Sequence, residues 1–239
     1  MKRIVALTLL ALSLIALCLQ ASRWQYQRYE FRHANNEIIR ANVNQMTDEN
    51  ALKNSQENQT LIAWKKISLA GHFEPEKEIL VRNRYHEGVY GYGVVTLFIS
   101  DSGRKYWVDR GWVRAGKDAK TVPMTQPVTT EPIIIEARVR TSNIEKQLGG
   151  TLFAFPSQSG ESELEKWNGS ESLQTEAVYF DLISTTPAQY TPDIRTPLPE
   201  LSDGPHLAYA VQWLLFALLV LLGWWLVIRE DRKVHSAKV

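Results

Sequence analysis

The chain carries its apolar residues in two long runs, one near each end, with a mixed segment between them. The longer run, residues 207–228, contains no charged residue. A helix rises about 1.5 Å per residue, so this run is long enough to cross a hydrocarbon core of roughly 30 Å. Trp224 and Trp225 lie near its end, where amphipathic rings suit the headgroup level. The pattern predicts a transmembrane helix over 206–228.

The first apolar run, residues 4–19, follows Met1-Lys2-Arg3 and has two interpretations. A basic start followed by an apolar stretch is typical of a cleaved signal peptide. The run is longer than the apolar part of most signal peptides, and Leu19-Gln20-Ala21 is a poor cleavage site. With Ala21 and Trp24 included, the segment is just long enough to span a membrane. We therefore expect an uncleaved transmembrane helix over residues 1–22.

Charge predicts how these two helices are oriented. Positive side chains follow the second span at once, in Arg229, Arg232, Lys233 and Lys238. An excess of Lys and Arg marks the cytoplasmic side, so residues 229–239 are expected to form a cytoplasmic tail. Two spans then place both termini in the cytoplasm and the central domain in the periplasm. No Ser- and Arg-rich transit segment precedes the first span, which favours a bacterial inner membrane.

The segment between the spans changes character twice. Residues 23–60 begin with helical spacing of Trp24, Arg28 and Phe31 and end in a polar loop. Residues 61–185 are dominated by strand signals, including short strands at 67–73 and 78–82, a hairpin over 89–113 and clean alternation over 133–140. Five prolines then make 186–205 an extended tether. The predicted architecture is a membrane protein in which two transmembrane α-helices flank one small, mainly antiparallel β domain, barrel- or sandwich-like.

Composition excludes several functions. The chain has 27 Lys and Arg against 26 Asp and Glu, and no concentrated basic face that would bind nucleic acid. Its one cysteine, Cys18, lies in the first apolar run, so the central domain has no disulfide or cysteine metal site. No hydrolase, phosphate-binding or zinc-protease motif is present. The alternating Glu74, Glu76 and Glu78 are expected to form a solvated strand face.

His206 is the residue whose position points most directly to chemistry. It opens the second predicted span, with Tyr209, Ala210 and Trp213 on the same helical face. An imidazole, a small residue that makes room and aromatic surface suit a porphyrin held by an axial histidine. The same residues also suit an aromatic belt packed on lipid. Physical reasoning leaves both interpretations open. Gln212, a polar group within the span, should face the other helix or a partner.

The chain resembles the surfeit locus protein family (Surf, called Shy in yeast), whose members are assembly factors for cytochrome c oxidase. Four stretches carry the resemblance, and they occur in the family's order. They are Arg23-Trp24-Gln25-Tyr26-Gln27-Arg28, like W-Q-x-x-R; Gly71-His72-Phe73 with Val81-Arg82-Asn83-Arg84, like G-x-F and x-x-N-R; Val108-Asp109-Arg110-Gly111-Trp112-Val113, like V-N-R-G-W-V; and His206-Leu207-Ala208-Tyr209-Ala210-Val211-Gln212-Trp213, like H-L-x-Y-A-x-Q-W. Asp109 stands where the family usually has Asn.

The resemblance implies a factor, not an enzyme, that helps to insert haem a into the catalytic subunit of a haem–copper oxidase. His206 is the implied axial ligand of transiently bound haem a, and therefore the only metal ligand, through the haem iron. Tyr209 and Trp213 would line the haem. Trp24, Arg28, Arg110 and Trp112 are candidates for juxtamembrane or interface contacts. The implied partners are the oxidase subunit, the haem a synthase and the lipid bilayer.

Two other functions fit the same sequence. The chain could be a membrane scaffold that binds the nascent oxidase subunit without touching haem. It could also be a membrane-tethered enzyme acting on envelope substrates, although no catalytic constellation is recognisable in the sequence. Copper delivery is disfavoured, because the central domain lacks cysteine and any Met and His cluster.

Overall fold

The computed structural model describes residues 2–54, 59–117, 121–141 and 163–236. The chain divides into two compact units. The helical unit comprises Met1–Glu37 and Glu200–Val239, and the β unit comprises Ile38–Pro199.

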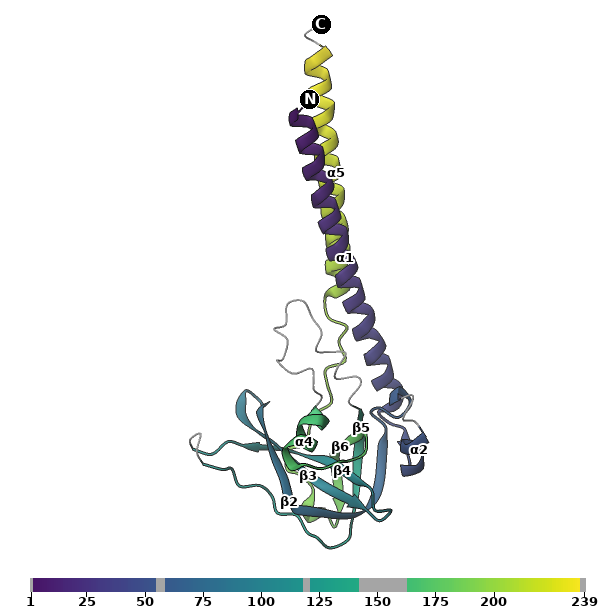
Figure 1. Ribbon diagram of the computed structural model, residues 1–239, viewed down its shortest axis with the longest axis vertical. Helices are drawn as coiled ribbons and strands as arrows, with labels where there is room; N and C mark the ends of the chain where they lie inside the picture. Colours follow the sequence, from purple (N-terminus) through teal and green to yellow (C-terminus); the bar gives the residue numbers. More distant parts are fainter. Residues whose placement is uncertain (1, 55–58, 118–120, 142–162, 237–239) are drawn as a thin grey trace. The chain divides into compact units, whose positions relative to one another are not determined.

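The helical unit consists of two long antiparallel helices. α1 spans Lys2–Asn42 and α5 spans His206–Ser236, so both predicted membrane helices form, and α1 continues without a break through residues 23–40. The Ser22 hydroxyl donates to the Ala210 carbonyl at 2.9 Å, and the Trp224 indole donates to the Thr8 hydroxyl at 3.0 Å. These pairs run in opposite order along the two helices, which makes the packing antiparallel (Figure 1).

The surfaces of these two helices suit a lipid environment. Lys2–Asn42 and His206–Lys233 are each long and apolar enough to cross a membrane. Their large apolar side chains are mostly exposed; Leu9 is 60% exposed and Leu219 is 61% exposed. A soluble protein rarely leaves such continuous apolar surface in water, whereas helices satisfy their own backbone groups in a bilayer. The chain is therefore a membrane protein.

The β unit is a closed barrel of five strands, with a sixth short strand at its edge. The strands are β1 (Met46–Thr47), β2 (Lys66–His86), β3 (Val89–Ser100), β4 (Lys105–Arg114), β5 (Ile133–Thr141) and β6 (Val178–Thr186). Their order is β2–β3–β4–β6–β5, and β5 pairs back onto β2, which closes the sheet. β1 pairs with β2 and β4 with β6 in parallel, and the other pairs are antiparallel. The prediction of a small, mainly antiparallel, barrel-like domain is confirmed.

β2 is the strand on which the closure depends. Residues 66–71 pair with β5, and residues 71–86 pair with β3. The two short strands predicted at 67–73 and 78–82 are therefore parts of one long strand. Its register shifts between Glu74 and Glu78 and again between Val81 and Arg84. Such irregularities bend a strand and re-aim its side chains.

The alternation of inward- and outward-facing side chains along the strands determines which residues form the core. In β5, Ile133, Ile135, Ala137 and Val139 are buried, as predicted, while Ile134 is 47% exposed. The barrel interior contains Phe73, Phe98, Tyr106 and Phe180. A second cluster lies under the short helix α4 (Glu163–Glu171), where the buried Trp107 donates its indole N–H to Asn168 Oδ1 at 2.8 Å. These two clusters hold the barrel and its helical cover together.

Among the described residues, the β unit also contains three short helical segments: α2 (Glu49–Asn54), the 3₁₀ turn η1 (Gln59–Leu61) and the 3₁₀ turn η2 (Ala188–Tyr190). Residues 191–199 have no helix or strand of their own. They pack on β4, where the Trp112 backbone N–H donates to the Ile194 carbonyl at 2.9 Å. The first part of the proline-rich segment thus forms one wall of the β unit.

Candidate functional sites

His206 is the first residue of α5, and its ring is held by α1. Its Nδ1 lies 2.8 Å from Gln25 Oε1. An amide oxygen only accepts hydrogen bonds, so Nδ1 carries the ring proton and Nε2 carries the lone pair. Histidines that ligate metals usually donate their other ring nitrogen to an acceptor in this way, which fixes the tautomer and the ring orientation. The geometry therefore presents Nε2 as a ligand.

Two arginines of α1 lie beside this imidazole. Gln25, Arg28 and Arg32 follow at helical spacings of three and four, so they share one face of α1. The charges of both arginines act on His206. The Arg32 guanidinium also approaches Gly204, where an added Cβ would lie 3.0 Å from Nη1. The imidazole lone pair can coordinate a metal, and the two adjacent arginines can pair with carboxylates. The arrangement therefore suits a ligand that contains both a metal and carboxylate groups.

The turn before His206 is also fastened to α1. The Asp203 carboxylate lies 2.8 Å from His33 Nδ1 and accepts a hydrogen bond from Asn36 Nδ2 at 2.7 Å. These contacts fix where α5 begins relative to α1. They therefore set the position of His206 against Gln25.

The other predicted residues of this helix differ in how much of their surface is exposed. Tyr209 is 46% exposed, and the half-buried Trp213 packs edge-on against Phe216, with ring centroids 5.6 Å apart. Ala210 is buried where α5 touches α1, and its expected role of making room for a porphyrin stays a prediction. Gln212 is exposed and does not pack on α1, which leaves a partner as the remaining expectation for its amide. Trp24 and Arg28 are half-buried on α1.

Arg110 and Trp112, predicted as interface candidates, belong to β4 in the β unit. The Arg110 side chain is only 3% exposed and forms a 2.9 Å ion pair with Glu78. It also donates to Thr96 Oγ1 at 3.2 Å and to the Gln126 carbonyl. Because a buried guanidinium needs such partners, Glu78 is structural, and its predicted place on a solvated face is wrong. Burial lowers the pKa of Arg110, and Glu78 opposes that shift.

Asp109 is a buried carboxylate that faces a second one. It lies opposite Asp181 in the parallel β4–β6 pair, and both residues are almost completely buried. Burial, reinforced by the Asp181 charge, raises the pKa of Asp109 to about 7. Arg84 Nη2, 3.8 Å from Asp109 Oδ2, and the Gly111 N–H, 2.9 Å from Oδ1, favour the ionised form less strongly. Asp109 therefore exchanges a proton near neutral pH.

Asp109 lies at the wall of a cavity of about 260 Å³, here called the barrel cavity. Its lining includes Trp64, Arg84, Asp109, Trp112, Arg140 and Arg195, together with residues 194–199. The Arg140 guanidinium lies 4.2 Å from the centre of the Trp64 ring, and its Nη1 is 2.9 Å from Asp181. The cavity thus combines guanidinium groups, aromatic rings and a titratable carboxyl.

Two glycines shape this cavity by letting backbone and rings approach closely. Gly111 has φ +97°, and a Cβ there would lie 2.1 Å from the Ile194 carbonyl oxygen. A Cβ on Gly91 would lie 2.4 Å from the Trp112 ring, so only glycine lets this indole lie against β3. Trp112 then donates its Nε1–H to the Arg84 carbonyl at 3.2 Å.

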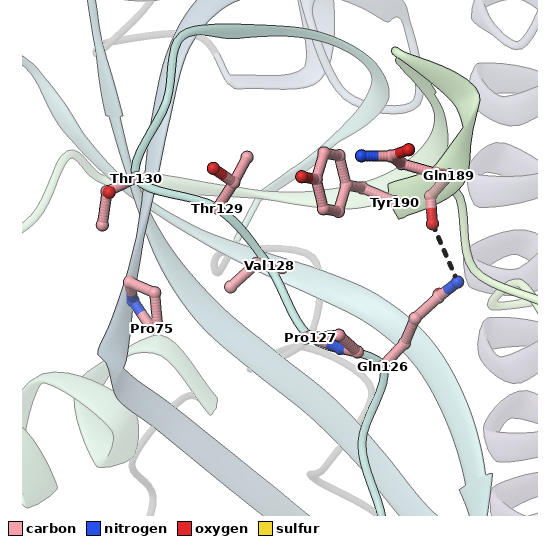
Figure 2. Close-up of a pocket in the computed structure, with 8 residues that line it drawn as sticks. All are labelled: Pro75, Gln126, Pro127, Val128, Thr129, Thr130, Gln189 and Tyr190. Atoms are coloured by element: carbon pink, nitrogen blue, oxygen red, sulfur yellow. Dashed lines mark hydrogen bonds between the residues drawn. The ribbon is translucent and has the colours of Figure 1, made fainter.

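A larger groove of about 650 Å³ lies elsewhere in the β unit. Figure 2 shows its lining, which consists of Pro75, Gln126, Pro127, Val128, Thr129, Thr130, Gln189 and Tyr190. The Gln126 amide reaches the Gln189 carbonyl at 3.0 Å. None of these side chains is charged, so the lining offers no ionic contact to a charged ligand.

Sequence reasoning missed the barrel cavity. His86 lines this cavity and packs against Trp112, with ring centroids 5.4 Å apart. The available signal was that two of the stretches that carry the family resemblance supply lining residues: Arg84 comes from x-x-N-R, and Asp109 and Trp112 come from V-x-R-G-W-V. Their convergence depends on strand pairing between residues far apart in the chain.

Comparison with known proteins gives one family. A sequence model of the SURF1 family matches residues 12–218. Uncharacterized SURF1-like proteins of Mycobacterium bovis and Mycobacterium tuberculosis are 28% identical over 166 residues, which is 67% of this chain and 58% of theirs. The chain therefore spans somewhat more than half the length of these relatives.

Proposed function

The chain belongs to the SURF1 family, and on that premise we propose that it assists cytochrome c oxidase assembly by carrying haem a to the catalytic subunit. In this proposal it is not an enzyme; haem a is its cargo. It receives haem a from the synthase and releases it to the oxidase subunit. The expected setting is a bacterial inner membrane, with both termini cytoplasmic and the β unit periplasmic.

The observation that carries this proposal is the hydrogen bond between His206 Nδ1 and Gln25 Oε1. It leaves Nε2 as the lone-pair nitrogen and stops the ring from rotating away. The contact therefore favours an axial ligand over a lipid-facing side chain.

The surrounding residues fit the rest of the cargo. Haem a carries two propionate groups, and Arg28 and Arg32 are the adjacent cations that would pair with them. Tyr209 and Trp213, on the same helix as His206, offer aromatic surface to the macrocycle. A single axial histidine with an open or weak second position would allow both binding and release, as a transfer protein requires.

The test is a pigment spectrum of the full chain, purified in detergent from cells that synthesise haem a. The wild type should contain haem a, and His206→Ala should lose it. Gln25→Leu should weaken haem binding by about 10- to 100-fold, the usual cost of removing a residue that orients a ligating histidine. His72→Ala, which changes a histidine in the β unit, is the matched control.

The same variants distinguish the rival functions. If His206→Ala loses pigment and also fails to restore oxidase assembly in a deletion strain, the proposal holds. Full restoration by His206→Ala would favour a scaffold that binds the oxidase subunit without haem. Normal oxidase content in the deletion strain would exclude an assembly role and revive the possibility of an envelope enzyme.

A further inference from the structure

The helical unit orients a second imidazole in the same way as His206. His33 Nδ1 lies 2.8 Å from Asp203 Oδ2, and Asn36 Nδ2 donates to the other oxygen of that carboxylate at 2.7 Å. A carboxylate only accepts hydrogen bonds, so His33 Nδ1 carries a proton. Histidines that ligate metals usually donate this second ring N–H to a carboxylate, carbonyl or water, which fixes the ring and strengthens the ligand. The contact presents Nε2 of His33 as a ligand, as Gln25 does for His206.

The surroundings of His33 leave room for a flat ligand. Among the residues that the structure describes, only Nδ1 of this ring has a hydrogen-bond or ion-pair partner, and the side chain is 45% exposed. The Tyr29 ring stacks on the imidazole, with centroids 5.5 Å apart and planes 20° apart. Tyr26 continues this row of rings, with its centroid 6.1 Å from that of Tyr29. Aromatic surface beside a ligating nitrogen suits a planar macrocycle.

The two imidazoles belong to one short region of the helical unit. Asp203, which holds His33, precedes His206 by three residues, and Gln25, which holds His206, precedes His33 by eight. Eight residues of helix correspond to about 12 Å along α1. The Arg32 guanidinium reaches the turn that joins Asp203 to His206, and its charge acts on His206. One cation is therefore placed to pair with a carboxylate of a ligand bound to either ring.

We propose that His33 is a second, weaker axial ligand for haem a, which accepts the iron from His206 during release. This inference rests on the haem-carrier function proposed above. In the step, the Fe–N bond to His206 Nε2 breaks and an Fe–N bond to His33 Nε2 forms. No electron is transferred, and each Nδ1 proton stays on its own ring. Arg32 retains a propionate throughout, so the cargo does not escape between the two rings. His33 is the weaker ligand because solvent reaches its half-exposed ring.

The variant that tests this inference is His33→Asn. The asparagine amide N–H replaces Nδ1–H as the donor to Asp203, but the side chain has no nitrogen lone pair that binds iron. The substitution therefore keeps the contact that fixes the start of α5 and removes the proposed ligand. His72→Asn is the matched control, because it changes a partly exposed histidine of the β unit that also lies near a carboxylate, with Nε2 3.4 Å from Glu74 Oε1.

The probe is ferric protoporphyrin IX, which has an iron and two propionates, titrated into the full chain in detergent and followed by absorption. The wild type should bind it through His206. His206→Ala should still bind it saturably but more weakly, through a site too weak to retain haem during purification. In that background, His33→Asn should weaken the remaining binding by about tenfold or more, since losing a ligand costs at least as much as losing the group that orients it. His72→Asn should leave it unchanged.

Resonance Raman spectra of the ferrous complexes identify the ligand. An iron–histidine stretching band should appear in His33→Asn, from His206, and in His206→Ala, from His33. The band from His33 should lie at the higher frequency, because its Nδ1–H donates to a carboxylate and not to an amide, which makes the imidazole the more basic ligand. The absence of such a band in His206→Ala would overturn the inference, because the remaining haem would then use another ligand.

Failure of this inference is distinguishable from failure of the carrier function. If the wild type does not bind the porphyrin, the carrier function fails and the second ligand fails with it. If the wild type binds through His206, but His33→Asn has no effect in the His206→Ala background, only the second ligand is refuted. In the deletion strain, His33→Asn should restore less cytochrome c oxidase than the wild type, and His72→Asn should restore as much. Full restoration by His33→Asn would refute its part in release.

Discussion

Replacing Asp109 with Asn should stabilise the β unit at pH 8. The carboxyl is buried beside Asp181, and its pKa rises from 3.8 to about 7. Each pKa unit corresponds to about 1.36 kcal/mol, so ionising this group in the folded state costs about 4 kcal/mol. The amide keeps an acceptor for the Gly111 N–H but loses the attraction of Arg84. We therefore expect a net gain of about 1 to 4 kcal/mol at pH 8.

The sign of the effect depends on pH. Because the folded pKa lies above the unfolded value, the folded state holds the proton more tightly between pH 4 and pH 7. The stability of the wild type should thus fall as pH rises through this window and level off above it. Asp109→Asn has no charge at this position, so its advantage should be absent near pH 4 and complete by pH 8.

Thermal unfolding of both proteins in the same detergent, followed by tryptophan fluorescence from pH 4 to pH 8, measures this difference. For a domain of this size, 1 kcal/mol corresponds to about 2–4 °C in Tm. Asp109→Asn should melt several degrees higher at pH 8 and within a degree or so of the wild type near pH 4. A Tm difference that does not change with pH, or a less stable Asn variant at pH 8, would refute this account of the Asp109–Asp181 pair.

Three further substitutions test the walls of the β unit by the same melting assay. Gly111→Ala should destabilise it by about 2 kcal/mol or more, because the new Cβ meets the Ile194 carbonyl; Gly103→Ala, also at positive φ but in open space, should cost less. Glu78→Gln should cost about 3 kcal/mol by leaving Arg110 buried without its counter-ion, whereas the exposed Glu76→Gln should cost little. Asn168→Ala should cost about 1–3 kcal/mol through the unpaired Trp107 N–H, against no change in Lys166→Ala. Equal Tm values within any of these pairs would contradict the corresponding contact.

The sequence predicts those parts of the fold that are set locally. Both apolar runs form helices because their length and composition leave few alternatives. The hairpin over 89–113 forms around Asp101-Ser102-Gly103, where Gly103 takes φ +81°. The alternation in β5 correctly separates buried Ile133 and Ile135 from exposed Ile134. In each case the residues that predict the feature lie within a few positions of the feature itself.

The charged pairs could not be predicted in this way. Asp109 and Asp181 meet only because β4 and β6 pair in parallel, and no local pattern specifies that neighbour. Glu78 follows the alternation of a solvated strand, but a register shift after Glu74 turns it toward the buried Arg110. Gln25 lies 181 positions from His206, so its role as the acceptor for the imidazole depends entirely on helix packing.

The four stretches that carry the family resemblance act as two pairs. Gln25 of the first stretch holds His206 of the last, and Arg84 of the second shares the barrel cavity with Asp109 and Trp112 of the third. Residues that act on one ligand are expected to be non-additive, because removing either partner already abolishes the joint effect. In a double-mutant cycle, Gln25→Leu should therefore weaken haem retention strongly when His206 is present. It should have no effect when His206 has already been replaced by Ala. Additive losses would mean that Gln25 acts on the cargo directly and does not position the imidazole.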